Sequence, residues 1–446
     1  GRSSRRYFSV LTIFTSVFVD TAGALYAGAV VLKAFFPSLD LWSTCIGLAV
    51  VAGLYTAAGG LAAVVYTDMI QAVVLLAGAV MLTYMVFAHP NIDFSWEAIT
   101  GSISGEMFHV LRPIDDPHLP WLGTLIGVPI LGFYFWCNNQ YIIQRVLGAK
   151  SIDDARWGAL FGGLLKLPVL FIMVLPGLVA TMIFPDVPAA NSDQIFPMMV
   201  TNLLPVGVVG LVMAGLVAAI MSSIDSTLNS TSALVTFDFV KVARPDMSEK
   251  AMANIGRLVM GIVMIVAALF APMIAHLGGL FAYLQEVLAF IVPPITVVFL
   301  VGAFSKRGNA GSAIKTMVIG HVFSISVFAL QKIEVLPPIH FTIVAGLLFA
   351  VSLGVFMLTS KGEATKTDEE LSDLLVGNNP PPQPGLKNYK VQAGALLTLT
   401  FVIVSLFSTW TQIAWMVSGM ALIGIIYYSR KSMKSSAIGE GLALDE

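Results

Sequence analysis

The chain has 446 residues, of which 57% are hydrophobic and only 11% charged, and its formal net charge is −2. Soluble domains carry about 25% charged residues, so this composition, with a mean hydropathy of +0.86, indicates a protein embedded in a lipid bilayer and excludes an ordinary soluble domain. The sequence has no P-loop, G-x-G-x-x-G pattern or basic tail, so we expect no nucleic-acid partner.

Apolar runs of about 20 residues predict an all-α protein with about twelve transmembrane helices. Helix-breaking residues separate the runs, as at Gly59-Gly60 and Gly278-Gly279. The last two runs are predicted to form a hairpin that turns at Ser408-Thr409. The predicted spans cover residues 8–36, 41–58, 61–88, 121–144, 157–183, 206–240, 251–276, 279–303, 309–331, 338–360, 389–408 and 411–429.

The basic residues predict the orientation in the plasma (inner) membrane. If the N-terminus of the chain is cytoplasmic, all but Lys33, Arg112, Lys166 and Lys332 of the 24 Lys and Arg residues lie on the cytoplasmic side. This bias is typical of membrane proteins, and it places the C-terminus in the cytoplasm as well.

Two polar segments interrupt the spans. Residues 89–120 form the longest predicted extracellular loop, with an amphipathic stretch from Ser95 to Leu111 that predicts a short helix at the membrane surface. Residues 361–388 combine an acidic run with Pro380-Pro381-Pro382, and they read as a cytoplasmic tether.

The segment Gly215 to Thr231 is polar although it lies inside a predicted span. Helical spacing places small and hydroxyl-bearing residues on one face, where their oxygens could bind a cation such as sodium. Such a face can equally serve close helix packing. Asp225 in the same segment favours the ion site, because a carboxylate is costly in hydrocarbon. The face consists of Ala219, Ser222, Ser223, Ser226 and Ser230.

Other polar groups also fall within predicted spans. Lys166 lies too deep to reach the interface, so it needs a partner, either Asp20 or Glu286 or a hydroxylated substrate. His321 reads as a packed polar residue rather than a ligand. Cys45 and Cys137 lie in apolar segments and support neither a disulfide framework nor a thiolate metal site.

Two further features concern a possible cavity. Pro293-Pro294 follows Gln285 and Glu286, and it could open the helix and expose backbone groups. The aromatic run from Phe133 to Trp136 could line a cavity, although such runs more often pack in the core or face lipid.

The sequence contains no nucleophile–base pair or metal motif at membrane depth, and no repeated filter loop. We therefore expect neither an enzyme nor a channel. Polar groups at mid-membrane on interrupted helices are typical of ion-coupled transporters.

The segment from Gly59 to Gln71 (GGLAAVVYTDMIQ) resembles the signature of the sodium/solute symporter family, which includes the sodium/glucose cotransporters. Four more blocks agree in order, and the similarity extends to about residue 310. The blocks are Asn139–Arg145, Leu165–Leu167, Ser222–Ser230 and Phe281–Gln285.

This resemblance implies the leucine-transporter fold, with two inverted repeats of five helices around a site at mid-membrane. It also implies that the chain is a fragment that lacks the first two core helices. The implied divisions are 1–88 as the rest of the first repeat, 89–120 as an extracellular loop, 121–303 as the second repeat, 304–360 as two accessory helices, 361–388 as the linker, and 389–446 as a C-terminal hairpin and tail.

The resemblance also implies roles for individual residues. The carbonyl oxygen of Ala219 and the hydroxyls of Ser222 and Ser223 match sodium ligands, and Asp68 with Ser223 and Asp225 resembles a second sodium site. Lys166 and Gln285 match positions that bond sugar hydroxyls. Phe281 and Trp136 match cavity walls, and Phe135 stands where an inner-gate tyrosine is common.

The implied function is sodium-coupled symport of a sugar, such as a hexose, or of a polyol. A symporter of an organic acid, such as sialic acid or a monocarboxylate, and a transporter-like solute sensor remain as alternatives.

Overall fold

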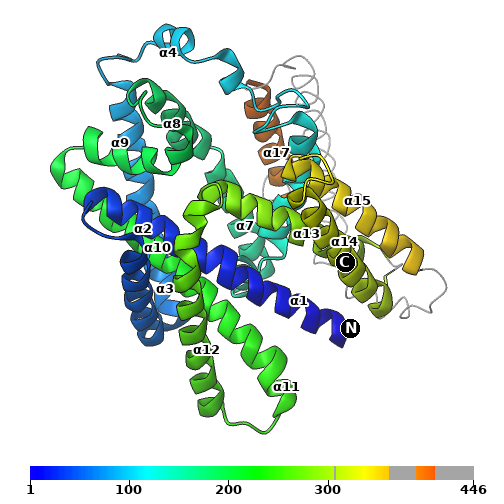
Figure 1. Ribbon diagram of the computed structural model, residues 1–446. Coiled ribbons are helices and arrows are strands. Elements are labelled where there is room, and N and C mark those ends of the chain that lie inside the picture. The colour runs from blue at the N-terminus through cyan, green and yellow to red at the C-terminus, as the bar shows by residue number, and fades with distance from the viewer. Residues whose placement is uncertain (306–307, 361–387, 407–446) are drawn as a thin grey trace, which may run out of the picture.

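The computed structural model describes residues 1–305, 308–360 and 388–406, and nearly all of them are helical (Figure 1). Eight of the described helices are long and apolar enough to cross a membrane. The helices are α1 (Arg2–Thr15), α2 (Ala22–Phe35), α3 (Leu41–Phe87), α4 (Trp96–Ser102), α5 (Val128–Cys137), α6 (Gln140–Leu147), α7 (Ile152–Lys166), α8 (Leu175–Val179), α9 (Ile195–Leu203), α10 (Val206–Leu234), α11 (Lys241–Ala243), α12 (Glu249–Phe270), α13 (Leu280–Phe304), α14 (Ala310–Lys332), α15 (Phe341–Thr359) and α17 (Tyr389–Leu406).

Short π-helical turns join several of these helices into longer spans. The turn η1 (Ser16–Thr21) links α1 to α2, and η7 (Val235–Val240) links α10 to α11. The resulting spans run over Arg2–Phe35 and Val206–Ala243, which agrees with the two unusually long runs in the sequence. Such π-helical turns occur frequently at functional sites, and η1 contains the carboxylate Asp20, which is half-buried.

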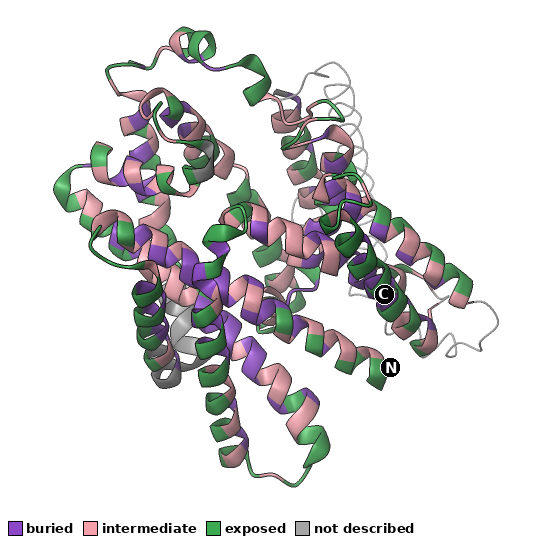
Figure 2. Cartoon of the chain, in the orientation of Figure 1, coloured by how far each residue is buried: buried purple, intermediate pink, exposed green. Residues whose placement is uncertain are grey.

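Helix α10 lies at the centre of the described structure. Its second half, through Ile224 and Leu228, belongs to a buried cluster with α2, α3 and α12. Its first half, through Val212 and Met213, joins a second cluster with α8 and α9. Buried residues gather where these helices cross (Figure 2). The contact between α10 and α3 is close, since a Cβ on Gly215 would lie only 2.8 Å from Cγ1 of Val74.

The predicted spans 41–58 and 61–88 form two arms of α3. The helix is continuous through Gly59-Gly60, so the expected break in helical structure is absent there. A straight helix would nevertheless separate Leu41 from Ala79 by about 57 Å. Both residues line cavities that also contain Tyr26 and Asp193, so the two arms double back to the same region.

In the 89–120 loop, where we predicted a short helix within Ser95 to Leu111, α4 begins after the N-cap Ser95 but ends at Ser102, and a 3-10 turn follows over Gly105–Phe108. The predicted spans near the end of the chain are only partly described. Helix α17 covers most of 389–408 and packs against α7, with the Arg156 guanidinium 4.4 Å from the ring centre of Tyr389. The linker 361–388, except for Asn388, and the span 411–429 lie outside the described residues.

The single span predicted over 121–144 is divided in two. Helix α5 ends at Cys137 and α6 begins at Gln140, with Asn138 and Asn139 between them. The Asn139 side chain accepts a hydrogen bond from the Tyr141 N–H at 3.3 Å, which caps α6. An asparagine N-cap competes with helical continuation, so a polar pair inside an apolar run created the break.

Pro293-Pro294, where we expected an open helix, instead lies inside the continuous α13. Helix α14 replaces one of the two donors that the prolines remove. The Ser324 hydroxyl donates to the carbonyl of Phe290, which would have paired with the absent N–H of Pro294. The His321 Nε2 lies 2.9 Å from the carbonyl oxygen of Ile291, so the prediction that His321 is a packed polar residue is confirmed.

We expect Ser324→Ala to lower the stability of the helical core, because it leaves the Phe290 carbonyl without its donor in a buried setting. The cost should be about 1 kcal/mol, which thermal unfolding of the purified protein in detergent would detect. Ser326→Ala is the matched control, because this exposed hydroxyl only bonds its own helix at Val322. Equal unfolding temperatures for the two variants would contradict the assignment.

Candidate functional site

A cavity of about 390 Å³ lies where α10 faces the broken helix pair α5–α6. Its walls come from η1, α2, α5, α6, α10 and α13, which are far apart in the sequence. The lining residues are Val19, Asp20, Gly23, Ala24, Ala27, Phe135, Tyr141, Ala219, Ile220, Ser223, Thr227, Leu280, Leu284, Gln285 and Leu288.

One face of α10 supplies oxygen atoms to this cavity. Ala219, Ser223 and Thr227 follow each other at intervals of four residues, so they stack along the same side of the helix. The Ser223 hydroxyl donates to the carbonyl of Ala219 at 3.1 Å, and the Thr227 hydroxyl donates to the carbonyl of Ser223 at 2.9 Å. Each hydroxyl therefore keeps oxygen lone pairs that can coordinate a cation.

The opposite wall carries Asp20, whose carboxylate hydrogen-bonds with the Asn139 side chain. Asn139 thus caps α6 and also ties it to η1. The other carboxylate oxygen, Oδ2, is buried and has no hydrogen-bond partner among the described residues. A carboxylate with one unpaired oxygen beside a cavity is a suitable ligand for a cation.

Helix α6 is also fastened to α10. The Arg145 guanidinium donates to the Ser226 hydroxyl at 2.5 Å, and the Gln144 amide donates to the Ser226 carbonyl at 3.4 Å. Ser226 is fully buried. These bonds hold α6 against α10 next to the cavity.

At its other end the cavity adjoins a second one of about 320 Å³, with which it shares Ala27, Ile220 and Leu280. Asp193 and Leu280 both line this second cavity, and the Asp193 carboxylate accepts a hydrogen bond from the Leu280 N–H at 3.0 Å, at the start of α13. Gly279 just before it has φ = +88°, a conformation that favours glycine. A Cβ at Gly279 would also lie 3.1 Å from the Asp193 carboxylate.

Comparison with known proteins identifies the family. Residues 1–320 match the model of the sodium:solute symporter family. The chain belongs to this family. The fold prediction is also confirmed. One solved structure that matches is described as the substrate-bound outward-open state of a Na⁺-coupled sialic acid symporter. The match has a TM-score of 0.66 and 21% identity, and it covers 82% of this chain and 78% of that one. That symporter has a leucine-transporter-like fold.

Curated relatives are transporters of the same family. Sodium/myo-inositol cotransporter 2 from Oryctolagus cuniculus is 36% identical over 364 residues, covering 74% of this chain and 54% of the relative. Sodium/mannose cotransporter SLC5A10 from Bos taurus is 34% identical, with 76% and 62% covered. Sodium/glucose cotransporter 4 from Danio rerio is 30% identical, with 72% and 54% covered. The chain thus spans little more than half the length of these relatives.

The cavity of about 390 Å³ contains four of the predicted site residues, namely Ala219, Ser223, Phe135 and Gln285. Phe135 packs edge-to-face on Trp136, with ring centres 5.4 Å apart, and on Tyr141 at 6.2 Å. These four predicted residues therefore face one cavity, although they lie on three different helices.

Other predicted residues lie outside this cavity. Lys166 is exposed and stands over the Trp136 ring at 5.4 Å, and Phe281 is 69% exposed on the first turn of α13. Neither partner expected for Lys166 pairs with it, because Glu286 forms an ion pair with Lys332 at 3.4 Å and Asp20 bonds Asn139.

The residues of the expected second ion site are distributed differently. Asp225 is fully buried on the opposite side of α10 from Ser223, and it accepts a hydrogen bond from the Thr56 hydroxyl. Ser222 is half-buried, and its carbonyl accepts from Ser226 at 2.9 Å. The side chain of Asp68 lies outside the described residues.

Sequence reasoning left Asp20, Asn139 and Tyr141 out of the site. Each had a signal in the sequence. Asp20 is a carboxylate in the middle of an apolar run, and Asn138-Asn139 is a polar pair inside another. What the sequence did not reveal is that these two signals belong together, because the Asp20–Asn139 bond joins positions more than a hundred residues apart.

We expect Asn139→Ala to reduce the unfolding temperature, because it removes the α6 cap and a hydrogen bond to Asp20. The loss of the cap alone should cost about 1 kcal/mol. Asn138→Ala is the matched control, since the Asn138 amide nitrogen has no hydrogen-bond partner among the described residues. The assignment predicts a clearly larger effect for Asn139, and equal effects would contradict it.

Proposed function

We propose that this chain forms the transport core of a sodium-coupled symporter for a small hydroxylated solute, a sugar or a polyol, working by alternating access. Family membership and the curated inositol, mannose and glucose cotransporters support this. Because the chain spans little more than half of those relatives, the experiments below use the full-length protein.

One observation carries the proposal. The Ser223 hydroxyl on α10 and the Gln285 amide on α13 line the same cavity, beside the break between α5 and α6. Interrupted helices at mid-membrane provide backbone and side-chain groups for ions and polar solutes. The alternative role for the serines of α10 is close helix packing. A face that served packing alone would not border a cavity that also contains the Asp20 carboxylate.

For sodium we propose the Ala219 carbonyl and the Ser222 and Ser223 hydroxyls as ligands, with Asp20 contributing negative charge from the opposite wall. One sodium ion that enters down a membrane potential supplies about 2.3 kcal/mol per 100 mV, which can drive solute accumulation. A second sodium ion at Asp225 and Asp68 stays a proposal, and Thr56 joins it through its hydrogen bond to Asp225.

For the solute we propose that Gln285 bonds hydroxyl groups and that Phe135 forms a wall. Lys166, Trp136 and Phe281 would meet the solute in another conformation of the transport cycle, since alternating access changes which residues face the cavity. A site with fixed polar groups rejects analogues that lack a hydroxyl, which would give specificity.

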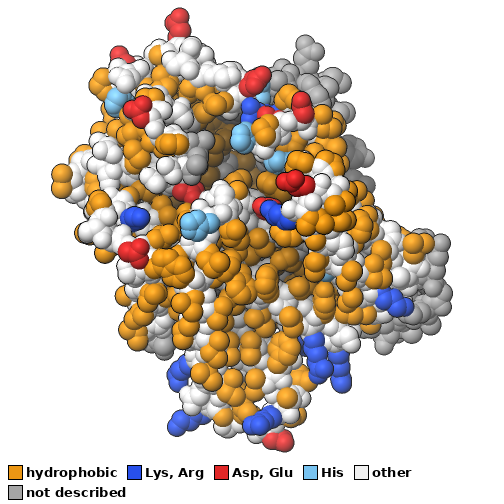
Figure 3. Space-filling model, in the orientation of Figure 1, with side chains coloured by type: hydrophobic (Ala, Val, Ile, Leu, Met, Phe, Trp, Pro, Cys, Tyr) orange, Lys and Arg blue, Asp and Glu red, His pale blue; other side chains and the backbone are white. Residues whose placement is uncertain are grey.

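The proposed orientation places the N-terminus of this chain in the cytoplasm. Most Lys and Arg side chains gather at the end of the molecule that carries α11 and the start of α12, whereas most Asp and Glu side chains lie toward the opposite end (Figure 3). The positive-inside rule assigns the basic end to the cytoplasm.

The function is tested by uptake into proteoliposomes. With an inward sodium gradient, the full-length protein should accumulate at least one labelled solute from a panel of hexoses, inositols, sialic acid and monocarboxylates. Accumulation of a sugar or polyol supports the proposal, and accumulation of organic acids alone would overturn its substrate class. If no solute shows uptake or counterflow, the hypothesis that the protein is a transporter-like solute sensor replaces the proposal of transport.

In the same assay, Ser223→Ala should raise the sodium concentration for half-maximal uptake by about tenfold or more, because one ligand oxygen is lost and the loss of a bond to a charged group costs about 1.5–3 kcal/mol. Ser326→Ala, on the exposed face of α14, is the control. An unchanged sodium dependence in the Ser223 variant would exclude this residue from the ion site.

Asp225→Asn tests the second ion. If Asp225 binds sodium, the Hill coefficient for sodium should fall towards one while solute affinity at saturating sodium changes little. A Hill coefficient equal to that of the unmodified protein, together with a lower unfolding temperature, would assign Asp225 a purely structural role through Thr56.

A further inference from the structure

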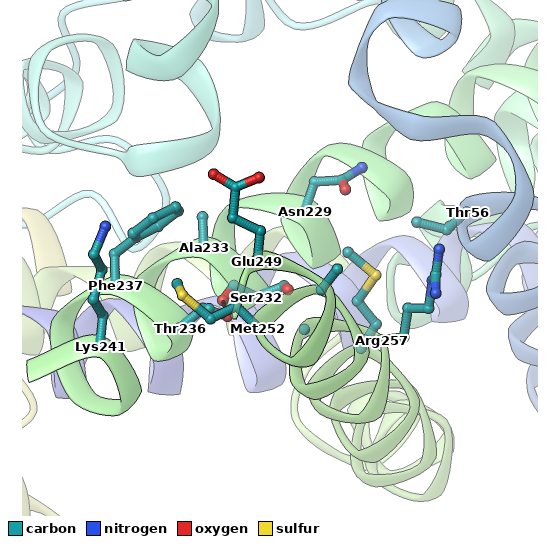
Figure 4. A pocket seen from close by; sticks show the side chains of 13 residues that line it. Thr56, Asn229, Ser232, Ala233, Thr236, Phe237, Lys241, Glu249, Met252 and Arg257 are labelled. Atoms are coloured by element: carbon teal, nitrogen blue, oxygen red, sulfur yellow. Dashed lines mark hydrogen bonds between the residues drawn. The ribbon is translucent and has the colours of Figure 1, made fainter. Parts of the chain in front are cut away.

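A second polar cavity, of about 680 Å³, lies at the basic end of the molecule, away from the proposed solute site (Figure 4). It is formed by the last turns of α10 with η7, by the start of α12, and by Thr56 of α3. Its described lining combines hydroxyl and amide groups with three charged side chains, Lys241, Glu249 and Arg257.

The charges in this cavity favour an anion. Lys241 and Arg257 lie on opposite sides of it, with Glu249 between them (Figure 4). All three side chains are exposed, and among the described residues none of them forms an ion pair. Arg244, just after α11, and Lys250, in the first turn of α12, add further positive charge nearby.

An apolar groove of about 500 Å³ continues from this cavity between the first arm of α3 and α12. The groove and the cavity share Arg257 and Met260. Beyond Arg257 the groove is lined only by apolar residues and glycine, and several of its side chains are strongly exposed, such as Leu54 at 70% and Ile265 at 63%.

The dimensions of the groove match one lipid leaflet. From Arg257 to Leu269, α12 rises by about 18 Å, whereas half of a bilayer's hydrocarbon core is about 15 Å thick. Gly261 keeps the groove open, since a Cβ there would meet nothing within 4 Å. An apolar channel of this length with a basic, polar end is complementary to an amphiphile with an anionic head.

We propose that this site binds one anionic phospholipid of the cytoplasmic leaflet. Its phosphate lies in the polar cavity between Lys241 and Arg257, and one acyl chain lies in the groove between α3 and α12. Basic residues at the cytoplasmic surface attract anionic lipids, and the buried chain adds hydrophobic free energy.

Such a lipid would contact the same helices that hold Asp225. Thr56 and Asn229 line the polar cavity, and they bond Asp225 through its carboxylate and, at 3.0 Å, through its backbone carbonyl. Occupancy of the lipid site would therefore brace the α3–α10 contact from the cytoplasmic side. Binding itself does not depend on whether the protein transports sodium or sugar.

The test is native mass spectrometry of the full-length protein in detergent, titrated with phosphatidylglycerol, with phosphatidylcholine of the same chains, and with glycerol 3-phosphate. We expect one tightly held phosphatidylglycerol, with phosphatidylcholine and glycerol 3-phosphate each binding much more weakly. Equal binding of phosphatidylcholine would overturn the role of the charges, and equal binding of glycerol 3-phosphate would overturn the role of the groove.

Variants separate the two halves of the site. Lys241→Gln with Arg257→Gln should weaken phosphatidylglycerol binding about thirtyfold, since each basic residue contributes about fivefold, and Glu249→Gln should strengthen it about fivefold. Gly261→Leu should block the acyl chain and weaken binding about tenfold or more. Lys150→Gln and Gly158→Leu are matched controls, because they lie outside the site and a Cβ at Gly158 meets nothing within 4 Å.

Two outcomes would overturn the proposal. One is wild-type affinity for phosphatidylglycerol in both the charge variant and Gly261→Leu. The other concerns the variant Leu54→Cys, whose new side chain lies in the groove. Cross-linking of this side chain to a protein segment rather than to a photoreactive lipid would show that protein covers the groove. If Gly261→Leu fails to fold, Gly53→Leu fills the same groove, since a Cβ there lies 3.9 Å from Met264.

Discussion

A helix in hydrocarbon must satisfy every backbone polar group from within the protein, because no water is available. This constraint explains two irregular places in the described structure. At Pro293-Pro294 the side chains of Ser324 and His321 contact the carbonyl oxygens that the prolines affect, and α13 stays continuous inside a packed core. At Asn138-Asn139 the chain instead supplies its own cap, and the gap opens beside a cavity.

Helix α10 divides its polar residues between different tasks according to the face on which they lie. Ser223 opens onto the cavity, whereas Asp225 is buried against Thr56 and Ser226 is bonded by Arg145. Adjacent hydroxyl positions are therefore not interchangeable, although they look alike in the sequence. Ala219, Ser223 and Thr227 follow each other at intervals of four residues, so they share one face of the helix. This spacing distinguishes the residues that face the cavity from the polar residues that pack against neighbouring helices.

Periodicity and composition predicted most of the helical spans and the packed role of His321, because these depend on local sequence. Of the face predicted on α10, only Ala219 and Ser223 line the cavity. Periodicity and composition did not predict which polar pair would open a helix. Pro293-Pro294 looked more likely than Asn138-Asn139 to interrupt a helix, because proline removes a backbone N–H donor. However, Ser324 of the neighbouring α14 donates to the Phe290 carbonyl in place of the N–H that Pro294 lacks. The Asp20–Asn139 bond and the exposed position of Lys166 likewise depend on how distant helices pack, which no local pattern specifies.

Only a few polar side-chain bonds join the helices around the cavity to one another. The Arg145–Ser226 and Gln144–Ser226 bonds join α6 to α10, and the bond between Asp193 and the Leu280 N–H joins the segment before α9 to α13. A buried hydrogen bond contributes about 0.5–1.5 kcal/mol, and about 1.5–3 kcal/mol when one group is charged. Under the proposed sodium coupling, one ion moving through 100 mV supplies about 2.3 kcal/mol. These bonds are thus of the same order as the proposed driving force, so an ion that binds two conformations with different affinity can shift the population between them.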